Sequence, residues 1–201
     1  MSEIRKVCVY CGSSPGTDPA YVKAAETFGR ILAEAKVGLV YGGGALGLMG
    51  ALAYAVLDHG GEVTGIIPEF LMSREKALRG THDMIVTHDM HERKRKMFDM
   101  ADAFVTLPGG VGTLEEVVEQ ITWMQLGRHR KPILLANING FWDPLCALFD
   151  HMKALDFIHS RGNFEVLVTD TVESILPMLR DFAAKVPEEA KRMEPTAAER
   201  L

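Results

Sequence analysis

The chain has no excess of positive charge and no long apolar run, and each absence excludes a class of function. Lysine and arginine number 22 against 27 aspartate and glutamate residues, which gives a net charge of −5. This balance argues against a general binder of nucleic acids or membrane surfaces. No apolar run approaches the ~20 residues of a membrane helix, and no charged-then-apolar signal begins the sequence. We therefore expect a cytoplasmic protein with neither nucleic-acid nor membrane partners.

Cysteine and histidine are too few and too scattered for a disulfide framework or a metal site. Three cysteines, an odd number, fit reduced thiols better than disulfides. Cys8 and Cys11 have a redox or metal spacing, but both fall in or just after a predicted strand and no second pair follows, so we interpret them as structural. The seven histidines form no pair at ligand spacing on one helix face. The sequence predicts no metal and no cofactor.

No linker rich in proline or serine divides the 201 residues, a length that suits one α/β domain. Short apolar runs alternate with helical patterns, which predicts right-handed crossovers and a parallel sheet. We expect a Rossmann-like doubly wound sheet of about six or seven strands with helices on both faces. The domain spans 1–186, and 187–201 form a polar tail. The predicted strands are 7–10, 37–41, 63–67, 84–86, 103–107, 133–136 and 164–168, and the predicted helices are 19–36, 48–58, 90–101, 114–126, 141–155 and 171–185.

A glycine-rich turn between a strand and a helix is the strongest local signal. Residues 108–116 read PGGVGTLEE, after the apolar run 103–107 and before apolar residues at helical spacing. Glycines let the backbone approach a phosphate, and the first helical N–H groups point at it. No Gly-Lys-Ser/Thr follows, and the spacing is not Gly-x-Gly-x-x-Gly, so this is neither a Walker loop nor a dinucleotide loop. The pattern predicts a phosphate site.

The phase of the helix after this loop singles out Glu116. An apolar stripe through Leu114, Val118, Ile121 and Met124 predicts the inward face, and Glu116 lies off it in the first turn. We expect its carboxylate to lie close to a bound phosphate ester, outside the core. Two interpretations stay open, and they are compatible. Thr113-x-x-Glu116 has the pattern of a capping box with Thr113 as N-cap, and Glu116 is also a candidate catalytic group.

A second glycine cluster follows the strand 37–41. Its Gly-x-Gly-x-x-Gly spacing matches a dinucleotide loop, so an NAD-dependent oxidoreductase is one alternative. The supporting acidic residue is out of place, because Glu62 lies at the start of the next strand. We favour a second glycine loop that faces the same pocket, made of Gly42, Gly43, Gly44 and Gly47.

Two basic residues are singled out by the phase of helix 90–101. Methionines 90, 97 and 100 share the inward face with Ala101, and Arg93 and Lys94 lie at its two borders. Arg95 points away and is interpreted as solvated. The sequence therefore places Arg93 and Lys94 half-buried near the anion loop. The residues 70–80 lack a clean period, and we expect them to form an excursion over this pocket.

These motifs together resemble the signature of the Lonely Guy (LOG) family, which hydrolyses nucleoside 5'-monophosphates, releases cytokinin bases and is often mislabelled lysine decarboxylase. The resemblance runs from Cys11 to about Pro132 and includes 90–94 (MHERK), 42–50 (GGGALGLMG) and 121–127 (ITWMQLG). It implies that Arg93 and Glu116 are catalytic. It also implies homodimers with the site near the interface. The residues it places around the substrate are Glu75, Lys94, Gly109, Gly110, Val111, Gly112, Thr113, Leu114, Glu115 and Thr122.

A phosphate loop, a carboxylate and a half-buried arginine suit cleavage of the N-glycosidic bond of a cytokinin or purine nucleoside 5'-monophosphate. Plain and N6-prenylated AMP both fit as substrates. Three alternatives compete: a non-catalytic nucleotide sensor, a pyridoxal-phosphate decarboxylase and the NAD-dependent enzyme. We also expect a homodimer, because the helix from Met90 and the helix carrying Trp123 and Met124 offer more apolar surface than one sheet layer covers.

Overall fold

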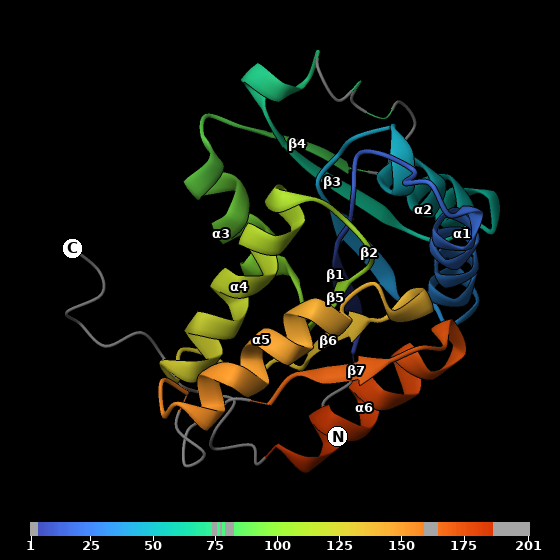
Figure 1. The fold of residues 1–201 in the computed structure, drawn as a ribbon. Coiled ribbons are helices and arrows are strands. Elements are labelled where there is room, and N and C mark those ends of the chain that lie inside the picture. The colour runs from blue at the N-terminus through green and yellow to red at the C-terminus, as the bar shows by residue number, and fades with distance from the viewer. Residues whose placement is uncertain (1–3, 74–75, 77, 79–82, 159–164, 187–201) are drawn as a thin grey trace.

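Seven parallel strands form one sheet in the computed structural model, which describes residues 4–73, 76, 78, 83–158 and 165–186 (Figure 1). The strand order is β4-β3-β2-β1-β5-β6-β7, so the predicted doubly wound fold is confirmed. The predicted tail 187–201 lies outside the described residues. The strands are β1 Lys6–Tyr10, β2 Gly38–Tyr41, β3 Val63–Pro68, β4 Asp83–Thr87, β5 Ala103–Thr106, β6 Ile133–Ala136 and β7 Leu167–Thr169.

Helices cover both faces of the sheet, three on each within the described residues (Figure 1). Helices α1 (Pro19–Glu34), α2 (Gly47–Asp58) and α6 (Ile175–Lys185) pack on one face. Helices α3 (Met90–Met100), α4 (Val111–Gln125) and α5 (Asp143–Ala154) pack on the other. The described residues also include three short 3-10 turns: η1 Glu69–Leu71, η2 Ile138–Gly140 and η3 Val172–Ser174.

The central strands are buried because both of their faces are covered. Every residue of β2, β5 and β6 is buried, which explains why these strands read as unbroken apolar runs. Cys8 of β1 and Cys11, the first residue after it, serve opposite faces: Cys8 packs among α3, α4 and α5, and Cys11 packs with α1 and α2. The two thiols therefore belong to separate cores, in agreement with the structural interpretation of the Cys-x-x-Cys spacing.

The chain reverses its direction of winding between β1 and β5, which are neighbours in the sheet. Strands β1 to β4 build outward on one side, and β5 to β7 build outward on the other. The loops after β1 and β5 meet there, where the Gly12 N–H donates to the Pro108 carbonyl at 3.0 Å. Open α/β sheets bind ligands outside the carboxyl ends of strands at such a switch point. The topology thus brings the glycine loop of 108–116 to the expected binding crevice.

Several predicted element details are wrong, and each error has a local cause. The last helix begins at Ile175 because η3 occupies its first predicted turn, and β7 spans Leu167–Thr169 instead of 164–168. Trp142, the N-cap of α5, and Phe149 within it are buried as expected, but Leu148 is 46% exposed. An apolar residue on an outer helix face is common, because polar residues do not cover the whole surface of a protein.

None of the helices in the described part of the chain has the length and apolarity that a bilayer crossing requires.

Candidate active site

The predicted phosphate loop lies at the N-terminus of α4. Gly110 is the N-cap, and the first intrahelical bond runs from the Leu114 N–H to the Gly110 carbonyl at 3.0 Å. The N–H groups of Val111, Gly112 and Thr113 precede that bond, so no intrahelical acceptor exists for them. Together with the helix dipole they can bind an anion. The loop must be tight, because a Cβ on Gly109 would overlap the Thr113 side chain.

The capping-box interpretation of Thr113 and Glu116 is wrong. Helix α4 begins at Val111, three residues earlier than that reading requires, and its N-cap makes no side-chain hydrogen bond. Thr113 is therefore inside the first turn and buried, and Glu116 falls in the second turn.

The inward face of α4 also differs from the predicted stripe. Leu114 and Val118 are 36% and 38% exposed, whereas Glu116 is only 8% exposed and Gln120 is fully buried. The buried residues of the helix are Thr113, Glu116, Val117, Gln120, Ile121 and Met124. The expectation that Glu116 stays outside the core is therefore wrong, and its carboxylate enters the molecule beneath the loop.

Glu116 meets Arg93 of α3 inside the protein. Arg93 Nη1 lies 3.4 Å from Glu116 Oε1, and both side chains are at most 10% exposed. The Arg93 Nε–H donates to the Ile66 carbonyl of β3 at 3.1 Å, and Nη1 also approaches Met90 Sδ at 3.7 Å. Arg93 is thus more deeply buried than the half-buried position predicted for it. A charge that leaves water in this way requires a partner, and the pair supplies one to each residue.

A polar cavity of about 260 Å³ opens beside this ion pair. It connects the phosphate loop to Arg93 and Glu116 across the carboxyl ends of β1 and β2. Its lining residues are Val9, Cys11, Gly12, Ser13, Gly42, Met49, Arg93, Gly110, Val111, Gly112, Thr113 and Glu116. Anion-binding amides, a carboxylate and a guanidinium therefore share one cavity.

Six of the residues that the resemblance places around the substrate or in catalysis line this cavity, and others do not. Arg93, Glu116 and the stretch 110–113 lie in it. Gly109, Leu114, Glu115, Lys94 and Thr122 are described but lie outside its lining, so their roles stay predictions. The Thr122 hydroxyl donates to the Val118 carbonyl of its own helix at 2.8 Å. Glu75 lies outside the described residues.

Lys94 joins two helices instead of pointing into the cavity. Its Nζ lies 2.6 Å from Glu115 Oε1 and 3.0 Å from Glu119 Oε1, both on α4. The Lys94 side chain is 11% exposed, and that of Glu119 is 23% exposed. Partial burial lowers the pKa of Lys94, but its hydrogen bonds to both carboxylates outweigh this and raise it. The prediction that Lys94 is half-buried is confirmed. Helical spacing did not identify its partners, Glu115 and Glu119.

Of the second glycine loop, only Gly42 lines the cavity. Gly43 and Gly47 have φ angles of +79° and +58°, which favour glycine for backbone reasons. The loop also uses its polar groups within the protein: the Ala45 N–H donates to the Lys76 carbonyl, and the Gly43 carbonyl accepts from the Leu78 N–H. The positive φ angles account for Gly43 and Gly47 without a bound dinucleotide.

Sequence reasoning missed a buried polar group behind Glu116. Tyr10 is the last residue of β1 and pairs in register with Thr106 of β5, and both are buried. Burial is the main cause that raises the pKa of Tyr10, and it raises that of the Cys8 thiol as well. Gln120 follows one turn after Glu116 on the same inward face. The sequence offered one signal of this burial: Gln120 lies four residues after Glu116, so the two side chains share one side of the helix.

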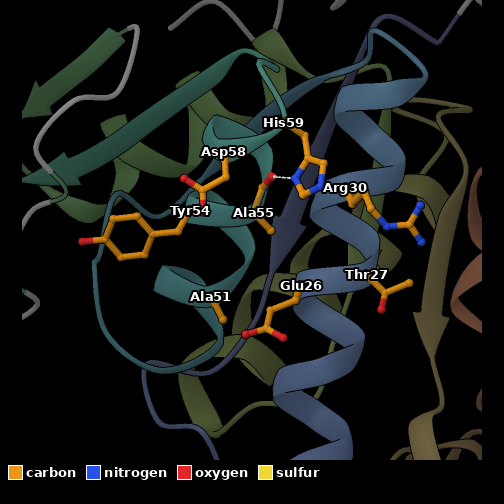
Figure 2. A pocket seen from close by; sticks show the side chains of 8 residues that line it. All are labelled: Glu26, Thr27, Arg30, Ala51, Tyr54, Ala55, Asp58 and His59. Atoms are coloured by element: carbon orange, nitrogen blue, oxygen red, sulfur yellow. Dashed lines mark hydrogen bonds between the residues drawn. The ribbon is translucent and has the colours of Figure 1, made fainter.

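A larger groove of about 420 Å³ lies elsewhere, between the exposed sides of α1 and α2 (Figure 2). Figure 2 shows polar side chains from both helices around it, including Glu26, Arg30 and His59, whose Nδ1 bonds to the Ala55 carbonyl at 2.8 Å. None of the predicted site residues lines this groove. Among the described residues no group of three histidine, cysteine or acidic side chains could hold a metal ion.

Known proteins match both the sequence and the fold. A family described as "Possible lysine decarboxylase" matches residues 49–179. The cytokinin riboside 5'-monophosphate phosphoribohydrolase LOG of Oryza sativa subsp. japonica is 43% identical over 187 residues, which cover 93% of this chain and 76% of the relative. The chain belongs to the LOG family. The span of 49–179 that the family matches in this chain contains both Arg93 and Glu116.

A second relative is about as similar to this chain as the Oryza sativa protein is. The cytokinin riboside 5'-monophosphate phosphoribohydrolase of Rhodococcoides fascians is 44% identical over 177 residues, which cover 88% of this chain and 89% of the relative. Among solved structures, the Moco carrier protein from Chlamydomonas reinhardtii has a TM-score of 0.69 at 20% identity, covering 92% of this chain and 100% of that one. This second similarity shows the fold alone.

Proposed function

We propose that this LOG protein hydrolyses the N-glycosidic bond of a nucleoside 5'-monophosphate and releases a free base and ribose 5-phosphate. Its relatives from Oryza sativa and Rhodococcoides fascians are phosphoribohydrolases of cytokinin riboside 5'-monophosphates, which supports this activity. The observation that carries the proposal is the buried pair of Arg93 and Glu116, which shares one cavity with the N-terminal amides of α4. A carboxylate and a cation beside an anion site match the needs of a phosphorylated sugar that develops positive charge.

The phosphate of the substrate serves as a handle. Amides at the start of α4 would accept its negative charge, helped by the helix dipole. The Thr113 hydroxyl lies in the same first turn and lines the same cavity. Binding energy from this remote group orients the ribose toward Glu116 and offsets the entropy of fixing the reacting parts.

Glu116 would act on the sugar carbon and on the attacking water. The bond between the anomeric carbon and the base nitrogen breaks, and its electron pair leaves with the base. Water then bonds to the anomeric carbon and gives one proton to the Glu116 carboxylate, while the base takes up a proton. The carboxylate returns its proton at the end of the cycle. One water is consumed for each base and ribose 5-phosphate released, and no redox step occurs.

Arg93 would hold Glu116 ready for this role. Its guanidinium lies 3.4 Å from the carboxylate and is itself fixed by the Ile66 carbonyl. An opposite charge at this distance favours the ionised carboxylate, which burial would otherwise disfavour. We infer that Arg93 keeps Glu116 charged and oriented.

The competing functions have weaker support. A pyridoxal-phosphate decarboxylase needs a lysine for its Schiff base, yet the described lining of the cavity contains no lysine and Lys94 Nζ is held by Glu115 and Glu119. The residues therefore do not fit that cofactor. A non-catalytic sensor has no evident use for the Arg93–Glu116 pair, whose burial is costly.

The proposed activity is tested with AMP and an N6-prenylated AMP, by chromatography of the free base and assay of ribose 5-phosphate. Glu116→Gln keeps the shape but cannot accept the proton, so base release should fall by about 10²- to 10⁴-fold. Arg93→Ala should fall similarly, whereas Arg95→Ala on the exposed face of α3 should match the parent protein. If the parent protein binds AMP without releasing base from either compound, the proposed activity is wrong and the sensor remains.

We also propose that the protein is a homodimer that uses the outer face of α4. The sequence argument that these two helices have apolar surface left uncovered is wrong, because Met97 and Met124 are buried within the chain itself. A different surface takes their place: Val111, Leu114 and Val118 recur at helical spacing on the outside of α4 and are 83%, 36% and 38% exposed. This stripe adjoins the phosphate loop.

A further inference from the structure

The guanidinium of Arg93 has neighbours on three separate segments of the chain. Its Nε–H donates to the Ile66 carbonyl of β3 at 3.1 Å. Its Nη1 lies 3.4 Å from Glu116 Oε1 on α4. Its Nη2 lies against Gly42, the first residue after β2. Each nitrogen of the group therefore has a neighbour on a different segment of the chain.

Gly42 has no backbone reason to be glycine. Its φ lies outside the left-handed region, in contrast to Gly43 at +79° and Gly47 at +58°. A Cβ at position 42 would instead overlap Nη2 of Arg93, and the next nearest atom would be Met49 Sδ at 3.2 Å. The space that a side chain would fill at Gly42 is thus occupied by the end of Arg93.

We propose that Gly42 is a positioning residue, whose missing side chain leaves the space in which the guanidinium of Arg93 reaches Glu116. This inference rests on the proposed function and extends it, since it assigns Gly42 to the arginine and not to the phosphate. The neighbouring residues support this assignment, because their polar groups are used within the protein and not for a phosphate. The Ala45 N–H donates to the carbonyl of residue 76, and the Gly43 carbonyl accepts from the N–H of residue 78.

Gly42→Ala is a suitable test because the overlap falls on the far end of a flexible side chain. Arg93 can swing aside while the backbone stays in place, so the variant should fold. A displacement of about 1 Å in a catalytic group can cost about 100-fold in rate, and we expect a kcat loss of that order with AMP. Inhibition by ribose 5-phosphate should be unchanged, because the amides of α4 are untouched.

Gly38→Ala is the matched control. Gly38 begins the same strand, its φ is also outside the left-handed region, and its nearest neighbour would be the flexible Lys6 side chain at 3.3 Å. It lies at the opposite end of β2 from the cavity, so this variant should keep the parent kcat. Loss of ribose 5-phosphate inhibition in Gly42→Ala would overturn the proposal, because Gly42 would then serve the phosphate.

A double-mutant cycle separates an effect through Arg93 from a general disturbance. Adding Gly42→Ala to Arg93→Ala should cause no further loss of kcat, since the displaced group is already absent. Independent, multiplied losses would overturn the proposal. So would a parent-like kcat in Gly42→Ala alone.

A spectroscopic readout does not depend on turnover. The Nε–H resonance of Arg93, assigned by its absence in Arg93→Ala, should shift in Gly42→Ala and stay in place in Gly38→Ala. If the parent protein releases no base, the proposed function fails while this measurement still decides the packing of Arg93. An unshifted resonance in Gly42→Ala would overturn the positioning role itself.

Discussion

At the scale of single residues, Gln120 is the buried polar side chain with the least compensation. It is fully buried, and neither its Oε1 nor its Nε2 has a hydrogen-bond partner among the described residues. Gln120→Met has a similar shape and removes both polar atoms, so we expect the free energy of unfolding to rise by about 1–3 kcal/mol. Urea unfolding measures this directly. A less stable variant would mean that the amide has a partner in solution.

His129 is a second buried polar residue, and its environment predicts a dependence of stability on pH. Its Nδ1 accepts from the Lys131 N–H at 3.1 Å, so Nε2 carries the proton and donates to the Gln120 carbonyl at 3.1 Å. Burial lowers the pKa of His129 to about 4, from a usual value of about 6.5. Between these values the unfolded chain binds a proton that the folded chain excludes, so stability falls as the pH falls.

We expect this residue to contribute a loss of roughly 3 kcal/mol in the free energy of unfolding between pH 6.5 and 4. His129→Gln cannot titrate and should show a correspondingly shallower loss in urea titrations across this range. The exposed His151 provides the control, and His151→Gln should follow the parent curve. Equal slopes for the parent and His129→Gln would contradict the assignment.

At the scale of elements, Lys94 connects α3 to α4. It donates hydrogen bonds to Glu115 and Glu119 on α4, and its chain neighbour Arg93 forms an ion pair with Glu116 on the same helix. We therefore expect Lys94→Glu and Glu119→Lys each to lower kcat and melting temperature, since each places like charges together. The double variant restores opposite charges and should recover part of both. No recovery in the double variant would favour direct contact of Lys94 with substrate.

Side chains cap the N-terminus of α3 and not that of α4. Asp89 is the N-cap of α3 and accepts from the Glu92 N–H at 2.8 Å, while the Glu92 carboxylate accepts from the His88 N–H at 2.9 Å. These hydrogen bonds to backbone N–H groups lower the pKa of both carboxyls. The helix that carries Arg93 is thus fixed at its start by side chains, whereas α4 leaves its first amides available for a ligand.

At the scale of the whole molecule, the outer stripe of α4 predicts the oligomeric state. Light scattering at micromolar concentration should give the mass of a dimer for the parent protein. Val118→Glu introduces a charge into the stripe and should shift the protein toward monomer, because an apolar interface does not accept an unpaired charge. Leu155→Glu changes another residue that is 55% exposed, the C-cap of α5 and not part of the stripe, and should remain dimeric. A monomeric parent would contradict the proposal.

The amino-acid sequence by itself determined the order of strands and helices, the glycine-rich turn before α4 and the identity of the central pair. These depend on local causes. Alternating apolar runs predict a parallel sheet, and glycines between a strand and a helix predict exposed amides. Arg93 and Glu116 were both named from motif and helical phase, and the structure brings them to 3.4 Å.

Only the tertiary structure decided which face of α4 turns inward and how deeply the charges are buried. The apolar stripe of Leu114 and Val118 and the face of Glu116 and Gln120 lie on one helix, and periodicity favoured the apolar one. The polar face could enter the core because Arg93 reaches Glu116 from α3, held by the Ile66 carbonyl of β3. That compensation joins residues distant in sequence, and spacing within one helix carries no information about it. For the same reason, the space at Gly42 that admits the guanidinium became evident only once β2 and α3 were side by side.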